Sequence, residues 1–144
     1  MRVLLPVDTD EDRAVATART VTSLPDAAES VHVTILNVEP KVDYPSGDGG
    51  RVDSDVWYDE EKFPASVGKA VTVLEDAGIT VEKRRMHGDP EEAIVEAIDE
   101  FDADWIVMAG RRRTPVGKVL FGSVTQSVLL HAAVPVTVVS AKSG

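Results

Sequence analysis

Three consecutive arginines, Arg111, Arg112 and Arg113, concentrate positive charge at one point of an acidic sequence. The chain has 144 residues and a formal net charge of −10, yet it places three of its nine arginines in one tripeptide. A guanidinium group can bind phosphate oxygens through two parallel N–H···O hydrogen bonds. The stretch AGRRRTPVGKVLFGSVTQSV, residues 109–128, therefore predicts an anion-binding site.

The residues on either side of the arginines favour the same chemistry. Gly110 lets the backbone turn tightly and approach a ligand. Gly122 and Ser123 begin a predicted helix, whose free N–H groups and dipole attract an anion. Asp8 follows the first apolar run and can accept hydrogen bonds from a ribose or a base. Two alternatives to an anion-binding site stay open. The arginines could form a solvated surface patch paired with nearby carboxylates, and the Gly-Ser pair could only cap a helix.

The elements that position these residues follow from the hydrophobic pattern. Apolar and β-branched runs predict strands, and apolar residues at helical spacing predict helices between them. Asp89 is the expected N-cap of the third helix, and Gly78 the residue that ends the second. Residues 39–55 predict a long loop, because they hold two Pro, three Gly and four Asp. The predicted strands are 2–7, 31–38, 79–86, 104–110 and 134–140, and the other helices are 10–24, 59–77 and 122–132.

This alternation of strands and helices predicts an α/β fold with a doubly wound, five-stranded parallel sheet and helices on both faces. The chain length fits one domain over residues 1–144. Ligands bind such sheets beyond the carboxyl ends of the strands, where the strand order reverses. With the order 3-2-1-4-5, that point lies between Asp8 and Gly110. The arginines are therefore expected over the crevice.

The amino-acid composition limits which classes of partner the protein is expected to bind. The 14 Asp and 11 Glu are spread over the chain, so we expect neither nucleic acid nor a membrane surface as a partner. No apolar run is long enough to span a bilayer, and the N-terminal residues lack a signal-peptide pattern. We therefore expect a cytoplasmic protein. The excess of Asp over Glu and of Arg over Lys favours a salt-loving source, and the absence of cysteine excludes disulfides and thiolate metal sites.

Other chemistries fit the sequence poorly. The spacing from Gly110 to Gly117 and Lys118 is too long for a Walker A loop. The three histidines fall in separate elements, so we expect no metal site. Ser123 has no obvious base beside it, and Asp8 is the one general base we can name. Any ATPase activity would therefore be slow, and we assign no catalytic residue.

Three segments together resemble the universal stress protein family: VLLPVD, HGDPEEAIVEAIDEFDADWIVMAGRRR and LFGSVTQSVLLHAAVPVTVV. The resemblance covers nearly the whole chain and implies the five-stranded sheet of order 3-2-1-4-5. It also implies a homodimer formed through the last strand, residues 134–140. The apolar character of that strand suits edge-to-edge pairing.

One branch of the family binds ATP through a loop of pattern G-x2-G-x9-G-[ST], and the resemblance carries that role over residue by residue. Gly110 matches the first glycine, and Gly122 and Ser123 match the final pair. Asp8 matches the acidic residue that contacts the adenosine. The remaining positions implied in the site are Pro6, Val7 and Val38 near the base and Val124 after the loop. ATP or another adenine nucleotide, with Mg²⁺, is the implied ligand.

The sequence departs from that pattern at the second glycine, whose place is taken by Arg113. The interval from Gly110 to Gly122 is also one residue shorter. A side chain there would hinder close backbone approach, whereas arginines can replace backbone N–H contacts with charged ones. Two functions therefore stay open: an adenine-nucleotide-binding stress or signalling module, or a dimeric interaction protein that binds no nucleotide. In the second, the arginines contact a protein partner or another anion.

Overall fold

The sheet has the predicted strand order. In the computed structural model, the described residues are 1–40, 43–45, 51–53, 62–110 and 121–140. Five parallel strands are arranged in the order β5-β2-β1-β6-β7, which is 3-2-1-4-5 in terms of the five predicted strands. Their bounds are β1 Arg2–Pro6, β2 His32–Glu39, β5 Thr80–His87, β6 Trp105–Gly110 and β7 Val136–Ser140.

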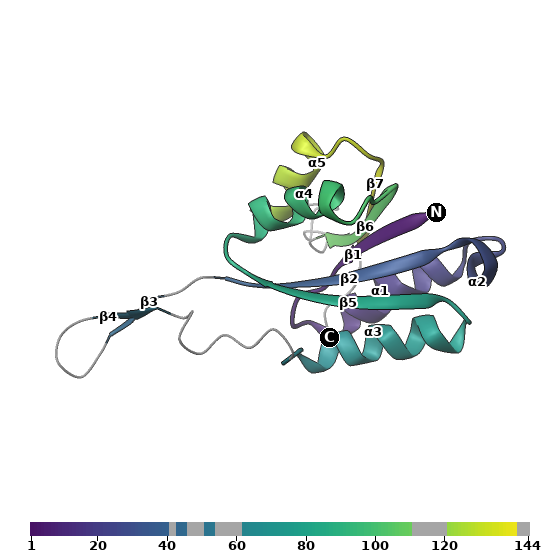
Figure 1. The fold of residues 1–144 in the computed structure, drawn as a ribbon, viewed down its shortest axis with the longest axis horizontal. Coiled ribbons are helices and arrows are strands. Elements are labelled where there is room, and N and C mark those ends of the chain that lie inside the picture. The colour runs from purple at the N-terminus through teal and green to yellow at the C-terminus, as the bar shows by residue number, and fades with distance from the viewer. Residues whose placement is uncertain (41–42, 46–50, 54–61, 111–120, 141–144) are drawn as a thin grey trace, which may run out of the picture.

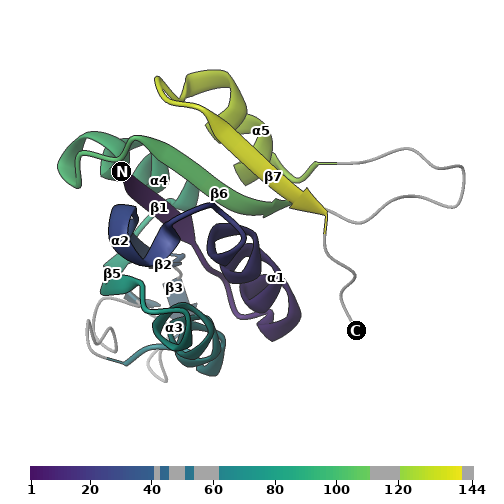
Figure 2. The ribbon, with the colours of Figure 1, turned by 90° about the vertical axis from the view of Figure 1, so that its right-hand side faces the viewer.

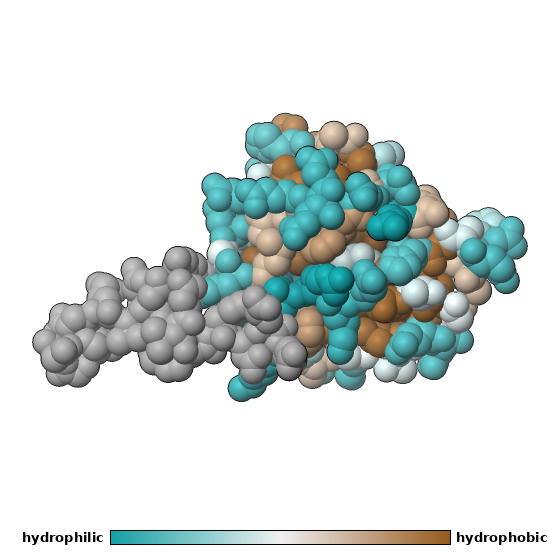
Figure 3. Space-filling model, in the orientation of Figure 1, coloured by the Kyte–Doolittle hydropathy of each residue, from teal (hydrophilic) through white to brown (hydrophobic). Residues whose placement is uncertain are grey.

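Helices cover both faces of the sheet, as predicted. Helices α1 (Glu11–Thr22) and α3 (Ala65–Asp76) lie on one face, and α4 (Pro90–Glu100) and α5 (Ser123–His131) on the other (Figures 1 and 2). A short helix, α2 (Ala27–Ser30), precedes β2 and was not predicted. Hydrophilic residues predominate over the helices visible in Figure 3, with apolar side chains showing between them.

The central strands bury side chains on both faces, which explains their nearly continuous apolar sequence. In β1, Val3 and Leu5 pack with α1 and α3, while Leu4 packs with α4 and β6. All three are at most 1% exposed. Burying one such side chain contributes about 1.5–3 kcal/mol. Two apolar layers, one on each face, therefore hold the sheet in place.

The helix ends confirm two sequence predictions. Asp89 caps α4 by accepting a hydrogen bond from the backbone N–H of Glu91 at 2.9 Å. Gly78 follows α3 with φ of +79°, and its N–H donates to the carbonyl of Glu75. Glycine adopts this left-handed conformation without steric cost. Asp10 caps α1 in the same way as Asp89 caps α4.

Two predicted elements were wrong in extent. The helix expected over 59–77 begins at Ala65, because Pro64 disfavours helical geometry in the residue before it. Residues 62–64 are not helical, and 59–61 lie outside the described residues. The expected loop over 39–55 contains an antiparallel pair, β3 (Asp43–Pro45) and β4 (Arg51–Asp53). Tyr44 pairs with Val52 across these strands, and the surrounding Pro and Gly obscured the strand signal in the sequence. The other boundaries shift by one or two residues.

Candidate functional site

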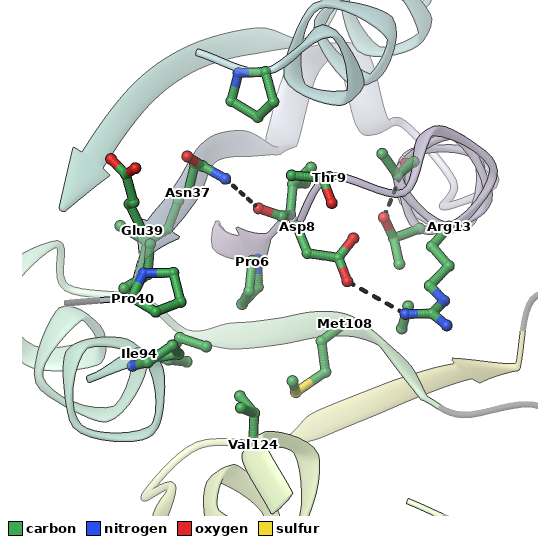
Figure 4. A pocket seen from close by; sticks show the side chains of 18 of the residues that line it. Pro6, Asp8, Thr9, Arg13, Asn37, Glu39, Pro40, Ile94, Met108 and Val124 are labelled. Carbon is green, nitrogen blue, oxygen red and sulfur yellow. Dashed lines mark hydrogen bonds and ion pairs between the residues drawn. The ribbon is translucent and has the colours of Figure 1, made fainter. Parts of the chain in front are cut away.

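A cavity of about 800 Å³ opens at the carboxyl ends of β1, β2 and β6. This volume lies within the ordinary range of small-molecule sites, and the position is the point where the strand order reverses. Figure 4 shows side chains from both faces of the sheet converging there. The cavity therefore occupies the place that the topology predicts for a ligand.

Most of the residues that the sequence selected meet at this cavity. Eight of them line it: Pro6, Val7, Asp8, Val38, Gly110, Gly122, Ser123 and Val124. They come from the ends of three strands and the start of α5. Arg111, Arg112 and Arg113 lie outside the described residues. The structure thus brings the predicted glycine, serine and aspartate positions around a single space.

One wall of the cavity is apolar. Val38, Ile94, Met108 and Val124 line it from β2, α4, β6 and α5, and Figure 4 shows the last three on the side of α4 and α5. The same residues belong to, or pack against, the core on that face of the sheet. A flat aromatic group would find dispersion contacts here on a wall that is already fixed by packing.

The start of α5 supplies anion-binding groups. Gly122 is the N-cap, and a glycine has no side chain that could cap the helix. The helix has nine residues, so its first N–H groups have no partner within the helix and its dipole favours negative charge. Ser123 adds a hydroxyl donor at the cavity wall. This end of the cavity suits a phosphate group.

Asp8 follows the carboxyl end of β1 and is held by several contacts. Its Oδ1 accepts a hydrogen bond from the N–H of Asp10 at 2.9 Å, and its Oδ2 lies 3.3 Å from Nη1 of Arg13. Its backbone carbonyl accepts a hydrogen bond from the buried hydroxyl of Ser66 on α3. The Asp8 side chain remains 60% exposed, so its carboxylate is accessible at the cavity.

The sequence analysis missed a polar network on the other side of the cavity. Buried Asn37 donates from Nδ2 to the carbonyl of Val7 at 2.9 Å and accepts from Nε of Arg85 at 3.2 Å. Arg85 also pairs with Glu39 at 2.8 Å. All four residues line the cavity. Asn37 interrupts the apolar run of Ile35, Leu36 and Val38, and this was the sequence signal that could have identified it.

The sequence analysis also did not identify Arg13 as a cavity residue. The sequence signal that could have identified it is its position three residues after the N-cap Asp10. Its guanidinium lies between Asp8 and Asp10, and Figure 4 shows it at the edge of the cavity beside α1. The described cavity therefore carries two arginine–carboxylate pairs, one near β5 and one near α1. Neither pair was predicted.

Over the described ranges, no group of three or more His, Cys, Asp or Glu side chains is placed to hold a metal ion. His32, His87 and His131 lie in β2, β5 and α5, respectively. In the same ranges, no helix is both long and apolar enough to cross a membrane.

Sequence comparisons place this fold among known proteins. The model of the Universal stress protein family matches residues 1–140. A universal stress protein of Methanocaldococcus jannaschii is 29% identical over 112 residues, which are 78% of this chain and 65% of that protein. One from Mycolicibacterium smegmatis is 43% identical over 67 residues, which are 46% of this chain and 52% of that protein. The matches span between about half and two thirds of these relatives.

Solved structures agree with the sequence matches. A universal stress protein from Archaeoglobus fulgidus is 30% identical, with a TM-score of 0.68 and coverage of 99% of this chain and 98% of that one. A universal stress protein structure from the same organism in complex with dAMP is 26% identical, with a TM-score of 0.62 and the same coverage. A universal stress protein in complex with cAMP is 21% identical, with a TM-score of 0.66, and supports the fold alone.

Proposed function

Because the chain belongs to the universal stress protein family, we propose that its cavity binds an adenine nucleotide, with ATP as the ligand and stress response or signalling as the role. The observation that carries the proposal is the meeting of Asp8, Gly110 and Ser123 around one cavity. These residues come from three separate parts of the chain. The complex of a 26% identical neighbour with dAMP adds support.

In the proposed complex, the base lies against the apolar wall and the phosphates lie at the start of α5. Val38 and Met108 supply apolar contact for the base. Asp8 accepts hydrogen bonds from ribose hydroxyls, and Ser123 donates to phosphate beside the N–H groups of α5. We propose that Gly110 and Arg111 to Arg113 continue the phosphate site. Mg²⁺ would enter with the phosphates.

The second candidate is a dimeric interaction protein of the same family that binds no nucleotide. The observation that favours it is Arg113, which stands where the ATP-binding pattern has glycine, together with the shorter interval to Gly122. In that case the arginines would contact a protein partner or another anion. Both candidates share four further predictions: a homodimer formed through residues 134–140, a single domain over residues 1–144, a salt-loving source and a cytoplasmic location.

Isothermal titration of protein freed of bound nucleotide tests the proposal, with ATP, AMP and inorganic phosphate in the presence of Mg²⁺. Saturable binding of ATP that weakens in Asp8→Ala and in Ser123→Ala supports nucleotide binding. No heat above that of dilution would overturn it. Binding that appears only in Arg113→Gly would favour the second candidate, because that result would mean the arginine closes the site.

A further inference from the structure

Arg13 links two carboxylates at the rim of the cavity. Its Nη1 lies 3.3 Å from Oδ2 of Asp8, and its Nε lies 3.7 Å from Oδ2 of Asp10. The Nε atom is shielded from solvent and makes no hydrogen bond with any residue that the structure describes. The backbone N–H of Arg13 separately donates to Asp10, the cap of α1. The Arg13 side chain is therefore not needed to cap α1, and its contact with Asp8 has a role apart from helix capping.

The Asp8 carboxylate presents a problem for a phosphorylated ligand. It is 60% exposed and lines the same cavity as Ser123 and the start of α5. Two negative charges within one cavity repel each other, and the repulsion grows as water is excluded. A bare carboxylate at this position would favour a neutral nucleoside over its phosphates.

The cavity's other described arginine–carboxylate pair lies elsewhere and is engaged differently. Arg85 is 12% exposed and is held by Glu39 at 2.8 Å and by Asn37 at 3.2 Å. This pair joins the ends of β2 and β5, where it also supports the carbonyl of Val7 through Asn37. The contact with Asp8 is made by Arg13, which is 28% exposed and lies at the rim.

We propose that Arg13 is a specificity-determining residue that makes this cavity select phosphorylated over unphosphorylated nucleosides. It balances the charge of Asp8, so that the carboxylate can accept ribose hydroxyls without repelling the phosphates. It also adds a cation that a phosphate can approach directly. This inference rests on the proposed nucleotide site, and it concerns the discrimination between ligands rather than the presence of the site.

The test compares ATP and adenosine by isothermal titration at about 0.1 M salt, where the Debye length is about 10 Å. In Arg13→Gln, we expect ATP to bind about tenfold more weakly and adenosine to change by less than about twofold. The matched control is Arg19→Gln, which removes the same charge from an exposed position on the same helix outside the cavity lining. It should leave both affinities unchanged.

A second variant separates charge balance from a structural role. In Asp8→Asn combined with Arg13→Gln, the ratio of ATP to adenosine affinity should return toward that of the wild type, because the uncompensated carboxylate is gone. Equal losses of ATP and adenosine affinity in Arg13→Gln would overturn this inference while leaving the nucleotide site in place. So would the same loss of ATP affinity in Arg19→Gln. A wild-type protein that binds neither ligand would overturn both proposals.

Discussion

Gly110 and Val138 lie so close together that no side chain fits between them. A Cβ atom added to Gly110 would lie 2.5 Å from Cγ1 of Val138, on the neighbouring strand β7, and 3.4 Å from the ring of Phe121. Real Cβ atoms do not approach carbon this closely. The glycine at the end of β6 is therefore required by packing, in addition to any role that it has toward a ligand.

Gly110→Ala should lower the free energy of unfolding by about 1–3 kcal/mol, because the added methyl group overpacks the contact between β6 and β7. Urea denaturation measures this change. The control is Gly68→Ala in the first turn of α3, where an added Cβ meets no atom within 4 Å. That substitution should stabilise the protein by about 0.5–1 kcal/mol through helix propensity.

Adding Val138→Ala to Gly110→Ala should recover part of the lost stability, since the smaller side chain makes room for the methyl group. A coupling energy of about 0.5–3 kcal/mol is expected for residues in direct contact. Strictly additive effects of the two substitutions would contradict the packing explanation.

Asn37→Leu should destabilise the fold by about 1–3 kcal/mol, because it leaves the carbonyl of Val7 without its side-chain donor and Nε of Arg85 without its acceptor. Asn37→Asp separates the two contacts, since a carboxylate keeps the acceptor for Arg85 and loses the donor to Val7. Urea denaturation of both variants tests this. An unfolding curve for Asn37→Leu that matches the wild type would show that the network contributes nothing.

Asp89→Ala should lower the free energy of unfolding by about 1 kcal/mol, because it removes the N-cap of α4. This helix carries Ile94, which lines the cavity. Thermal unfolding followed by circular dichroism measures the loss. Glu96→Ala, at an exposed position within the same helix, is the control and should change stability by less than about 0.5 kcal/mol. Equal losses in the two variants would argue against a capping role.

The proposed homodimer predicts a mass of about 31 kDa in solution, which is twice the 15.5 kDa of one chain. Strand β7 lies at one edge of the five-stranded sheet, and an unpaired edge is a template for pairing with a second copy. Sedimentation equilibrium at several protein concentrations gives the mass. A species of 15.5 kDa at every concentration would contradict the dimer.

Local sequence patterns predicted most of the fold. Asp89 and Gly78 marked helix ends through their capping chemistry, and the apolar runs marked strands buried on both faces. The strand order did not come from these patterns, because periodicity does not say which strands are neighbours. It came from the family resemblance. The β3–β4 pair was missed because short strands carry weak signals beside glycine and proline.

The position of the cavity was predicted where chain order and topology coincide, and part of its lining was missed where it depends on strand register or on how a helix leaves a strand. Asp8 and Gly110 follow directly after strands, so their meeting at one edge could be inferred. Arg85 reaches the cavity because β5 pairs with β2 in a register that sets it opposite Asn37. No sequence pattern encodes that register. The pairing of Arg13 with Asp8 likewise depends on how α1 leaves the end of β1.

The most direct test of the central claim is a map of amide chemical shifts in ¹⁵N-labelled protein titrated with ATP and Mg²⁺. If the nucleotide occupies the cavity, the largest changes should fall at its walls, at Asp8, Val38 and Ser123. Amides of α2, at the opposite end of the sheet, should not move (Figure 1). Saturating ATP that shifts no cavity amide, or that shifts amides only elsewhere, would contradict the proposed nucleotide site.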